Sequence, residues 1–268
     1  MPRIRPPAVA DMFYPADAQE LQEMVSGYLR EAAQDAEAGG VPKALIVPHA
    51  GYVYSGPVAA SAYVRLLPAR RKIRRVVLLG PSHRVPLLGL ASSSADAFST
   101  PLGTIPLDRQ AIERAEQLPQ VHRLDEAHAL EHSLEVQLPF LQSVLDDFSL
   151  VPLVVGDASP AEVAEVLELL WGGPETLIVI SSDLSHYHDY DTASVLDNAT
   201  SQAIEHLQLE RIHGENACGF HAVNGLLYLL RKRGDELGLH GHTLDLRNSG
   251  DTAGPRDRVV GYGAYAFE

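Results

Sequence analysis

The chain has 268 residues, which is typical of one α/β core, so we predict one domain over residues 1–268. Its hydrophobic content of 46% and charged content of 21% are those of a globular protein and exclude a disordered or fibrous chain. With 21 Lys and Arg against 35 Asp and Glu, the formal charge is −14, which disfavours nucleic acid and anionic lipid surfaces as partners.

The amino-terminal residues mix prolines and charges and have no apolar segment of the kind that signal peptides contain. No run approaches the roughly 18 apolar residues of a membrane span. The single cysteine, Cys218, cannot form an internal disulfide, which fits a reducing compartment. We therefore expect a cytoplasmic protein without a membrane segment.

The predicted elements alternate between helices and short apolar strands. Strands are predicted over residues 43–48, 75–80, 150–156 and 176–181. Helical patterns cover residues 18–38, 56–67, 126–145, 161–170, 193–207 and 219–231. Residues 94–107 are typical of a hairpin, and residues 258–267 alternate as a last strand. Apolar strands separated by helices predict an α/β fold with a central, mostly parallel sheet flanked by helices.

Three predicted strands are each followed by a histidine: His49, His83 and His186. One such loop histidine is more often bonded to nearby backbone than functional. Ligands of open α/β sheets collect at the carboxyl ends of strands, however, and three imidazoles at that edge favour a site there.

His49 and His83 are candidate metal ligands, because neutral imidazole is the commonest protein ligand for metals. Cys218 precedes an apolar helix, so a helix N-terminus could lower its thiol pKa and make it a third ligand. The alternative is a buried cysteine that packs as a small hydrophobic residue.

The predicted helix over 126–145 carries His128 and His132 four residues apart, a spacing that zinc-binding helices also use. The acid Glu131 adjoins the second histidine rather than the first, which departs from the zinc motif. We expect His132 and Glu135 to line a substrate pocket, with metal ligation by His132 as the alternative.

Asp183 and His186 share one short loop and could form a carboxylate–imidazole pair for general acid–base catalysis. The alternative is a helix-capping aspartate beside an ordinary histidine. Tyr54 lies in a predicted loop between Gly51 and Gly56 and could stack on an aromatic substrate, although such tyrosines are as often plain packing.

Taken together, these motifs resemble the Memo family, whose prokaryotic members are called AmmeMemoRadiSam system protein B. The matching segments are residues 6–15, 48–56, 79–83, 131–140, 181–186, 217–219, 249–252 and 260–265. The resemblance implies a fold similar to that of the class III extradiol ring-cleavage dioxygenases. It also implies His49, His83 and Cys218 as metal ligands, with Asp183 and His186 in the pocket and His186 as the acid–base group.

The dioxygenases use a carboxylate where the resemblance places Cys218, and a sulfur ligand is softer and can itself be oxidised. The resemblance thus implies a mononuclear site, with iron as first choice and copper or zinc as alternatives. Its chemistry would be redox or O₂-dependent and would act on a small organic substrate. The alternative is a non-enzymatic metal- or peptide-binding protein that acts with a radical SAM protein and an AMMECR-type protein. Zinc-dependent hydrolysis is the third hypothesis.

Overall fold

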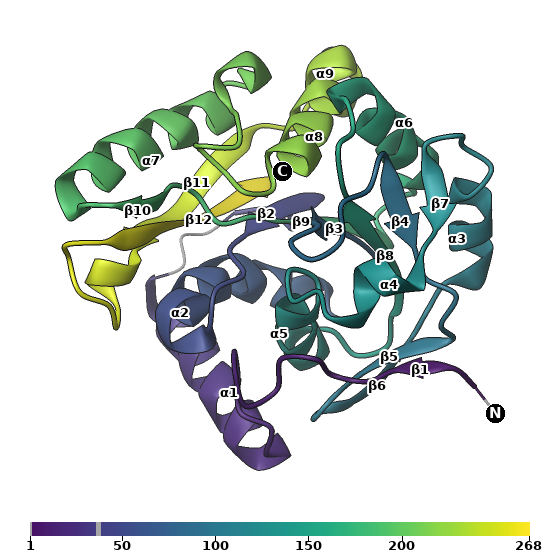
Figure 1. The fold of residues 1–268 in the computed structure, drawn as a ribbon, viewed down its shortest axis with the longest axis horizontal. Helices are drawn as coiled ribbons and strands as arrows, with labels where there is room; N and C mark the ends of the chain where they lie inside the picture. The colour runs from purple at the N-terminus through teal and green to yellow at the C-terminus, as the bar shows by residue number, and fades with distance from the viewer. Residues whose placement is uncertain (1, 36–38) are drawn as a thin grey trace.

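The computed structural model describes residues 2–35 and 39–268 (Figure 1). Within these residues, nine strands form one sheet in the order β10-β12-β2-β9-β3-β8-β4-β7, and β11 pairs with β12 outside this path. The strands are β2 (Ala44–Val47), β3 (Arg75–Pro81), β4 (Leu90–Ser92), β7 (Val121–Arg123), β8 (Ser149–Val155), β9 (Thr176–Ser181), β10 (His186–His188), β11 (Gly241–Asn248) and β12 (Val259–Phe267).

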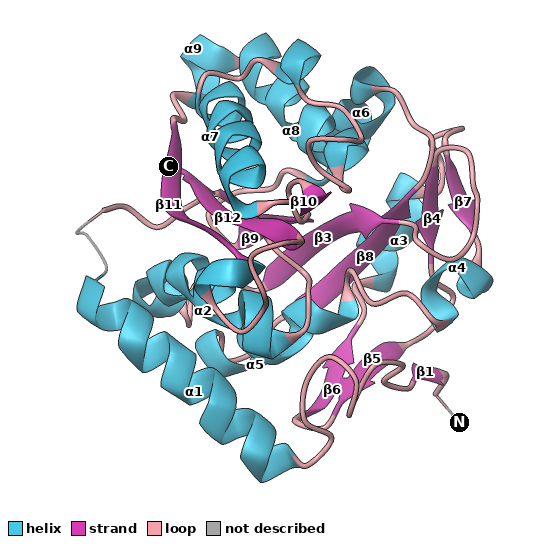
Figure 2. Ribbon diagram, turned by 60° about the vertical axis from the view of Figure 1, so that its left-hand side comes forward, coloured by secondary structure: helices cyan, strands magenta, loops and turns pink. Residues whose placement is uncertain are grey.

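Helices cover both faces of this sheet (Figure 2). On one face lie α1 (Ala18–Asp35), α2 (Tyr52–Tyr63) and α5 (Leu138–Val144), and on the other lie α6 (Pro160–Leu170), α7 (Tyr190–Glu205) and α8 (Phe220–Lys232). The shorter helices are α3 (Arg109–Ala115), α4 (Asp125–Ala129) and α9 (Gly234–Leu237), and the 3-10 turns are η1 (Val64–Ala69), η2 (Glu135–Gln137), η3 (Leu209–Arg211) and η4 (Ser249–Asp251). A small second sheet joins β1 (Ile4–Arg5), β5 (Ala97–Thr100) and β6 (Gly103–Pro106).

The predicted α/β fold is confirmed, and the four apolar runs form β2, β3, β8 and β9, which are buried along nearly their whole length. The predicted hairpin is β5–β6, and the last predicted strand is β12. The sheet is mixed rather than mostly parallel, because β12 runs antiparallel to β2, β10 and β11. The predicted end of the first helix, at residue 38, lies outside the described residues.

One continuous helix over 126–145 was a wrong prediction, since the chain forms α4, a turn, η2 and α5 there. The carboxylate of Glu131 accepts the backbone N–H groups of His132 and Ser133, which a continuing helix would use itself. Pro139 then lies in the first turn of α5, a position that proline tolerates. The loop predicted around Tyr54 is also wrong, because α2 begins at Tyr52.

The centre of the sheet decides where functional side chains can gather. Strands β2, β9 and β3 are neighbours and parallel, so their carboxyl ends lie at one edge. The loops after these strands carry His49, His83 and Asp183. Nowhere in the described part of the chain is a helix long and apolar enough to cross a bilayer.

Candidate metal site

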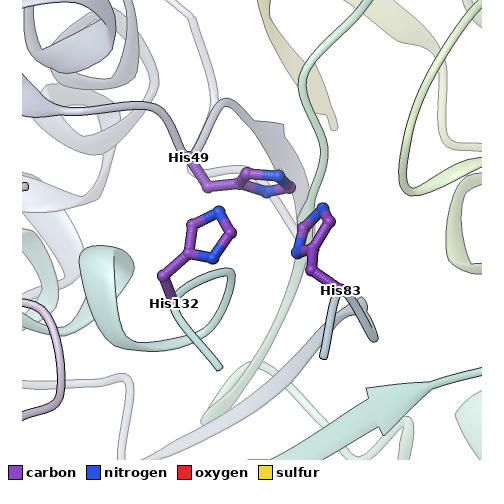
Figure 3. A group of neighbouring side chains, drawn as sticks. All are labelled: His49, His83 and His132. Carbon is purple, nitrogen blue, oxygen red and sulfur yellow. The ribbon is translucent and has the colours of Figure 1, made fainter. Parts of the chain in front are cut away.

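Three imidazoles meet at the carboxyl edge of the sheet (Figure 3). His49 follows β2, His83 follows β3, and His132 lies in the turn between α4 and η2. One ring nitrogen of each lies within 4.8 Å of the others, and the His83 and His132 rings stack with centroids 4.6 Å apart. The structure thus brings His49 and His83 together, and His132 joins them from a turn where the sequence predicted helix.

The hydrogen bonds around His49 determine its tautomer. The Ser181 hydroxyl donates its one proton to the Ser133 carbonyl at 2.6 Å and accepts a hydrogen bond from the Gln137 amide at 2.8 Å. The His49 Nδ1, 2.9 Å from the same hydroxyl, must therefore be the donor of that contact. The lone pair of His49 is therefore on Nε2, which lies 3.2 Å from the sulfur of Cys218 at the cavity.

His83 is oriented in the same way by a buried carboxylate. Its Nδ1 donates to Glu131 Oε1 at 2.9 Å, and its backbone N–H donates to Glu131 Oε2 at 2.6 Å. Burial alone would raise the pKa of Glu131, but the hydrogen bonds from His83 and Ser133 bring it down to about 2. Glu131 is therefore a carboxylate at neutral pH, so Nδ1 of His83 is the donor of this contact and Nε2 is the nitrogen left for a metal.

His49 is suited to bind a cation as a neutral ring. Burial, followed by the charges of neighbouring histidine rings, holds the pKa of His49 well below its ordinary range. A neutral imidazole whose second nitrogen is bonded to a protein acceptor is the usual form of a metal ligand. Ser181 and Gln137 could not be predicted in this role, since neither belongs to a ligand-type motif.

Cys218 lies beside His49, with Sγ 3.2 Å from His49 Nε2. The sulfur also accepts a hydrogen bond from the backbone N–H of Asp183 at 3.3 Å. The expected lowering of its pKa is wrong: burial, and then the charge of Asp183, raise the pKa of the thiol well above its ordinary range. Without a metal Cys218 is a thiol, and binding a metal would require it to lose its proton.

Asp183 and His186 face the same cavity but do not form the expected pair. Asp183 Oδ1 accepts the backbone N–H of His49 at 2.7 Å, and burial raises the pKa of this carboxyl to about 6. His186 lies in β10 and lines the cavity. Within residues 2–35 and 39–268, no hydrogen bond joins the two side chains.

His132 lines the cavity, as expected, but its ring is held less firmly than the other two. Its Nδ1 is buried and has no hydrogen-bond partner among the described residues. Burial, followed by the charge of His83, lowers the pKa of His132 to about 4, so the ring is neutral at pH 7. Phe13 packs against its face with ring centroids 4.6 Å apart.

Glu135 and Tyr54, both expected to bind substrate, lie outside this cavity. The Glu135 carboxylate is fully buried, pairs with Arg5, and accepts the Tyr14 hydroxyl and the backbone N–H groups of Ala8 and Val9. Tyr54 lies in the first turn of α2 with 38% of its surface exposed. Glu135 instead fixes the amino-terminal segment, because its lone pairs are all taken by that segment.

The cavity has a volume of about 740 Å³ and opens to solvent on the side away from the sheet. Besides the residues above, its wall includes Arg84, Tyr187, His188 and Glu215. The volume is within the range of small-molecule sites.

The contact between His49 and Cys218 has nearly the spacing of two ligands of one metal ion, whereas the group whose ligand atoms all lie within 4.8 Å of one another is His49, His83 and His132. Metal–nitrogen bonds of about 2.0–2.1 Å and metal–sulfur bonds of about 2.3 Å place neighbouring tetrahedral donors roughly 3.3–3.6 Å apart. The 3.2 Å between His49 Nε2 and Cys218 Sγ is close to that spacing. Imidazole and sulfur together suit iron, copper and zinc better than magnesium or calcium.

Comparisons with known proteins give one consistent family. A family model described as Memo-like protein matches residues 5–266. A MEMO1 family protein of Ignicoccus hospitalis is 36% identical over 286 residues, covering 98% of each chain. A MEMO1 family protein of Aquifex aeolicus is 36% identical over 274 residues, covering 97% of each. A solved structure of an uncharacterized protein from Escherichia coli K12 is similar with a TM-score of 0.45 and 14% identity, covering 82% of this chain and 98% of that one.

Proposed function

Because this chain belongs to the Memo family, we propose that it binds one metal ion between His49, His83 and Cys218. One observation carries the proposal. Two imidazoles whose Nδ1–H groups donate to protein acceptors line one cavity, and a thiol lies 3.2 Å from the Nε2 of one of them. Iron is the metal we expect, because the family resembles dioxygenases that hold Fe(II). Copper and zinc are the alternatives that the same donors would accept.

His132 is assigned to the cavity wall rather than to the ligand set. Ligating histidines nearly always donate their second ring N–H to a protein acceptor, as His49 and His83 do. The Nδ1 of His132 lies 3.3 Å from Glu131 Oε1 but does not form a hydrogen bond with it. A neutral His132 ring instead closes one side of the cavity next to the metal position.

The chemistry proposed is a redox or O₂-dependent reaction of a small organic substrate. A bound iron or copper ion would supply a redox-active centre with room for a further ligand on the cavity side. His186 would give or take the proton, because its imidazole lines the cavity and no protein hydrogen bond in the described chain occupies it. Asp183 holds the His49 backbone in place through its 2.7 Å hydrogen bond.

Substitution with cobalt(II) tests the ligand set, since a thiolate bound to cobalt absorbs strongly in the near ultraviolet. We expect this band in the wild type and in His132→Ala, and its loss in Cys218→Ser. Cobalt that binds the wild type without this band, and that binds Cys218→Ser equally well but not His132→Ala, would replace the proposed ligand set by three histidines.

Nitric oxide tests whether the site is built for reaction or for binding alone. On the iron-loaded protein, we expect nitric oxide to bind and give a paramagnetic signal, because the cavity leaves space beside the metal position. His186→Ala should keep its iron while losing any oxygen consumption that a substrate screen finds. A closed site that takes up no nitric oxide would contradict the proposed enzymatic reaction and favour a protein that only binds metal.

A further inference from the structure

Arg84 is a cation without a partner at the candidate metal site. It follows the proposed ligand His83 directly, is exposed, and lines the same cavity. Within the described residues its guanidinium makes no hydrogen bond or ion pair. By contrast, Arg5, Arg75 and Arg123 each pair with a carboxylate.

The acidic groups that face the cavity do not neutralise this charge. The Asp183 carboxyl is buried and accepts the backbone N–H of His49. Glu215 is exposed on the cavity wall, and in the described part of the chain no ion pair joins it to Arg84. The other polar wall residues, His186 and His188, can donate hydrogen bonds. An unneutralised cation therefore lies beside the metal position in a chain of net charge −14.

The guanidinium group recognises planar anions best, because its fork of N–H donors matches the two oxygens of a carboxylate. The rings of His83 and His132, which stack on one another, line the same cavity as Arg84. From this juxtaposition we infer that the cavity binds a small organic acid. Its carboxylate pairs with Arg84, and its body reaches toward the metal position. The metal position in this inference rests on the proposed function. The binding of the carboxylate rests on Arg84 alone.

Fluorine NMR with two probes of nearly equal shape tests the inference. The probes are para-fluorobenzoate, which carries the carboxylate, and para-fluorobenzamide, which does not. The wild-type protein should bind the benzoate more tightly than the benzamide. Arg84→Gln should weaken benzoate binding by about tenfold or more and leave benzamide binding unchanged. The affinity of Arg84→Lys for the benzoate should lie between those of the wild type and Arg84→Gln, because lysine keeps the charge and lacks the two parallel N–H donors of the guanidinium.

Arg30→Gln is the matched control, since Arg30 is exposed on α1 and also has no partner among the described residues. It should bind both probes as the wild type does. Equal binding of the two probes by the wild type, or an Arg84→Gln protein that binds the benzoate normally, would overturn the inference.

Metal content measured on the same samples separates this inference from the proposed function. Arg84 makes no contact that folding needs, so Arg84→Gln should keep the wild-type metal content and melting temperature. Arg84-dependent benzoate binding in a wild type that holds no metal would support the anion site and contradict the metal. A wild type that holds metal, together with benzoate binding that Arg84→Gln leaves unchanged, would support the metal site and contradict the anion site.

Discussion

Glu131 organises the candidate metal site more than any other single residue. Its carboxylate accepts the Nδ1–H and the backbone N–H of His83, and also the backbone N–H groups of His132 and Ser133. One buried side chain therefore fixes both the tautomer of a proposed ligand and the turn that carries the third imidazole.

Glu131→Gln should weaken metal binding by about 10–100-fold, the usual effect of removing a partner that orients a ligand. Competition with a chelator on zinc- or cobalt-loaded protein measures this. Glu135→Gln is the matched control, because Glu135 is equally buried four residues away but faces the amino-terminal segment. An equal loss of metal affinity in the two variants would mean that Glu131 affects metal binding only by stabilising the folded protein.

The pKa of Glu131 also predicts a pH dependence of the metal-free protein. Its value is about 2 in the folded chain against 4.5 as the ordinary value, so the folded state binds this proton less readily than the unfolded state. The stabilisation is complete above pH 4.5 and is lost as the pH falls from 4.5 toward 2. Its size is of the order of 3 kcal/mol.

Urea unfolding at pH 6 and at successively lower pH measures this dependence. The free energy of unfolding should fall with acidification in the wild type and fall less in Glu131→Gln. His132, whose pKa is lowered to about 4, adds a loss of the same sign between pH 6.5 and 4 in the wild type. Identical slopes in both proteins would show that Glu131 has an ordinary pKa.

At the scale of elements, the amino-terminal segment is held by one buried glutamate. Glu135 pairs with Arg5 and accepts the backbone N–H groups of Ala8 and Val9 at 2.8 and 2.9 Å. Further along the segment, Phe13 packs against His132. The segment thus connects the small sheet containing β1 to the wall of the cavity.

Glu135→Ala should release this segment, because Arg5 and two backbone N–H groups lose their acceptor. We expect a loss of about 3–5 kcal/mol in the free energy of unfolding, typical of breaking a buried ion pair from one side. Hydrogen exchange at Ala8 and Val9 should become faster by at least tenfold. Unchanged exchange at both amides would contradict the assigned role.

Strands were easier to predict from this sequence than the region around His132. The segments that form β3 and β9 are mainly apolar and almost wholly buried. Such segments are typical of strands that are covered on both faces of a sheet. The region 126–145 has a helical pattern, yet the Glu131 carboxylate competes for its backbone donors. The same carboxylate is bonded to His83 in the loop after β3, a partner distant in sequence that a local pattern could not reveal.

At the scale of the whole molecule, the core is continuous from α1 through the sheet to α8. We therefore expect residues 1–268 to unfold as one cooperative unit. The fluorescence of Trp171, the only tryptophan, and far-ultraviolet circular dichroism should give coincident urea transitions. Separate midpoints would indicate two units.

His49 and His83 lie at one edge of the sheet, as the sequence predicted, because they follow β2 and β3, two parallel strands on either side of β9. The sequence could not exclude Glu135 or Tyr54, whose side chains point elsewhere for reasons of packing. It also could not anticipate the high pKa of Cys218, since that follows from burial and from Asp183.

Metal content by mass spectrometry tests the central claim most directly. The protein should be purified anaerobically without a metal-affinity resin, as wild type, His49→Ala, Cys218→Ser and the control His122→Ala, which alters an exposed residue of β7. We predict close to one iron or copper ion per chain in the wild type and the control, and its loss in the other two. A wild type without metal, or metal that is indifferent to both His49→Ala and Cys218→Ser, would contradict the proposed site.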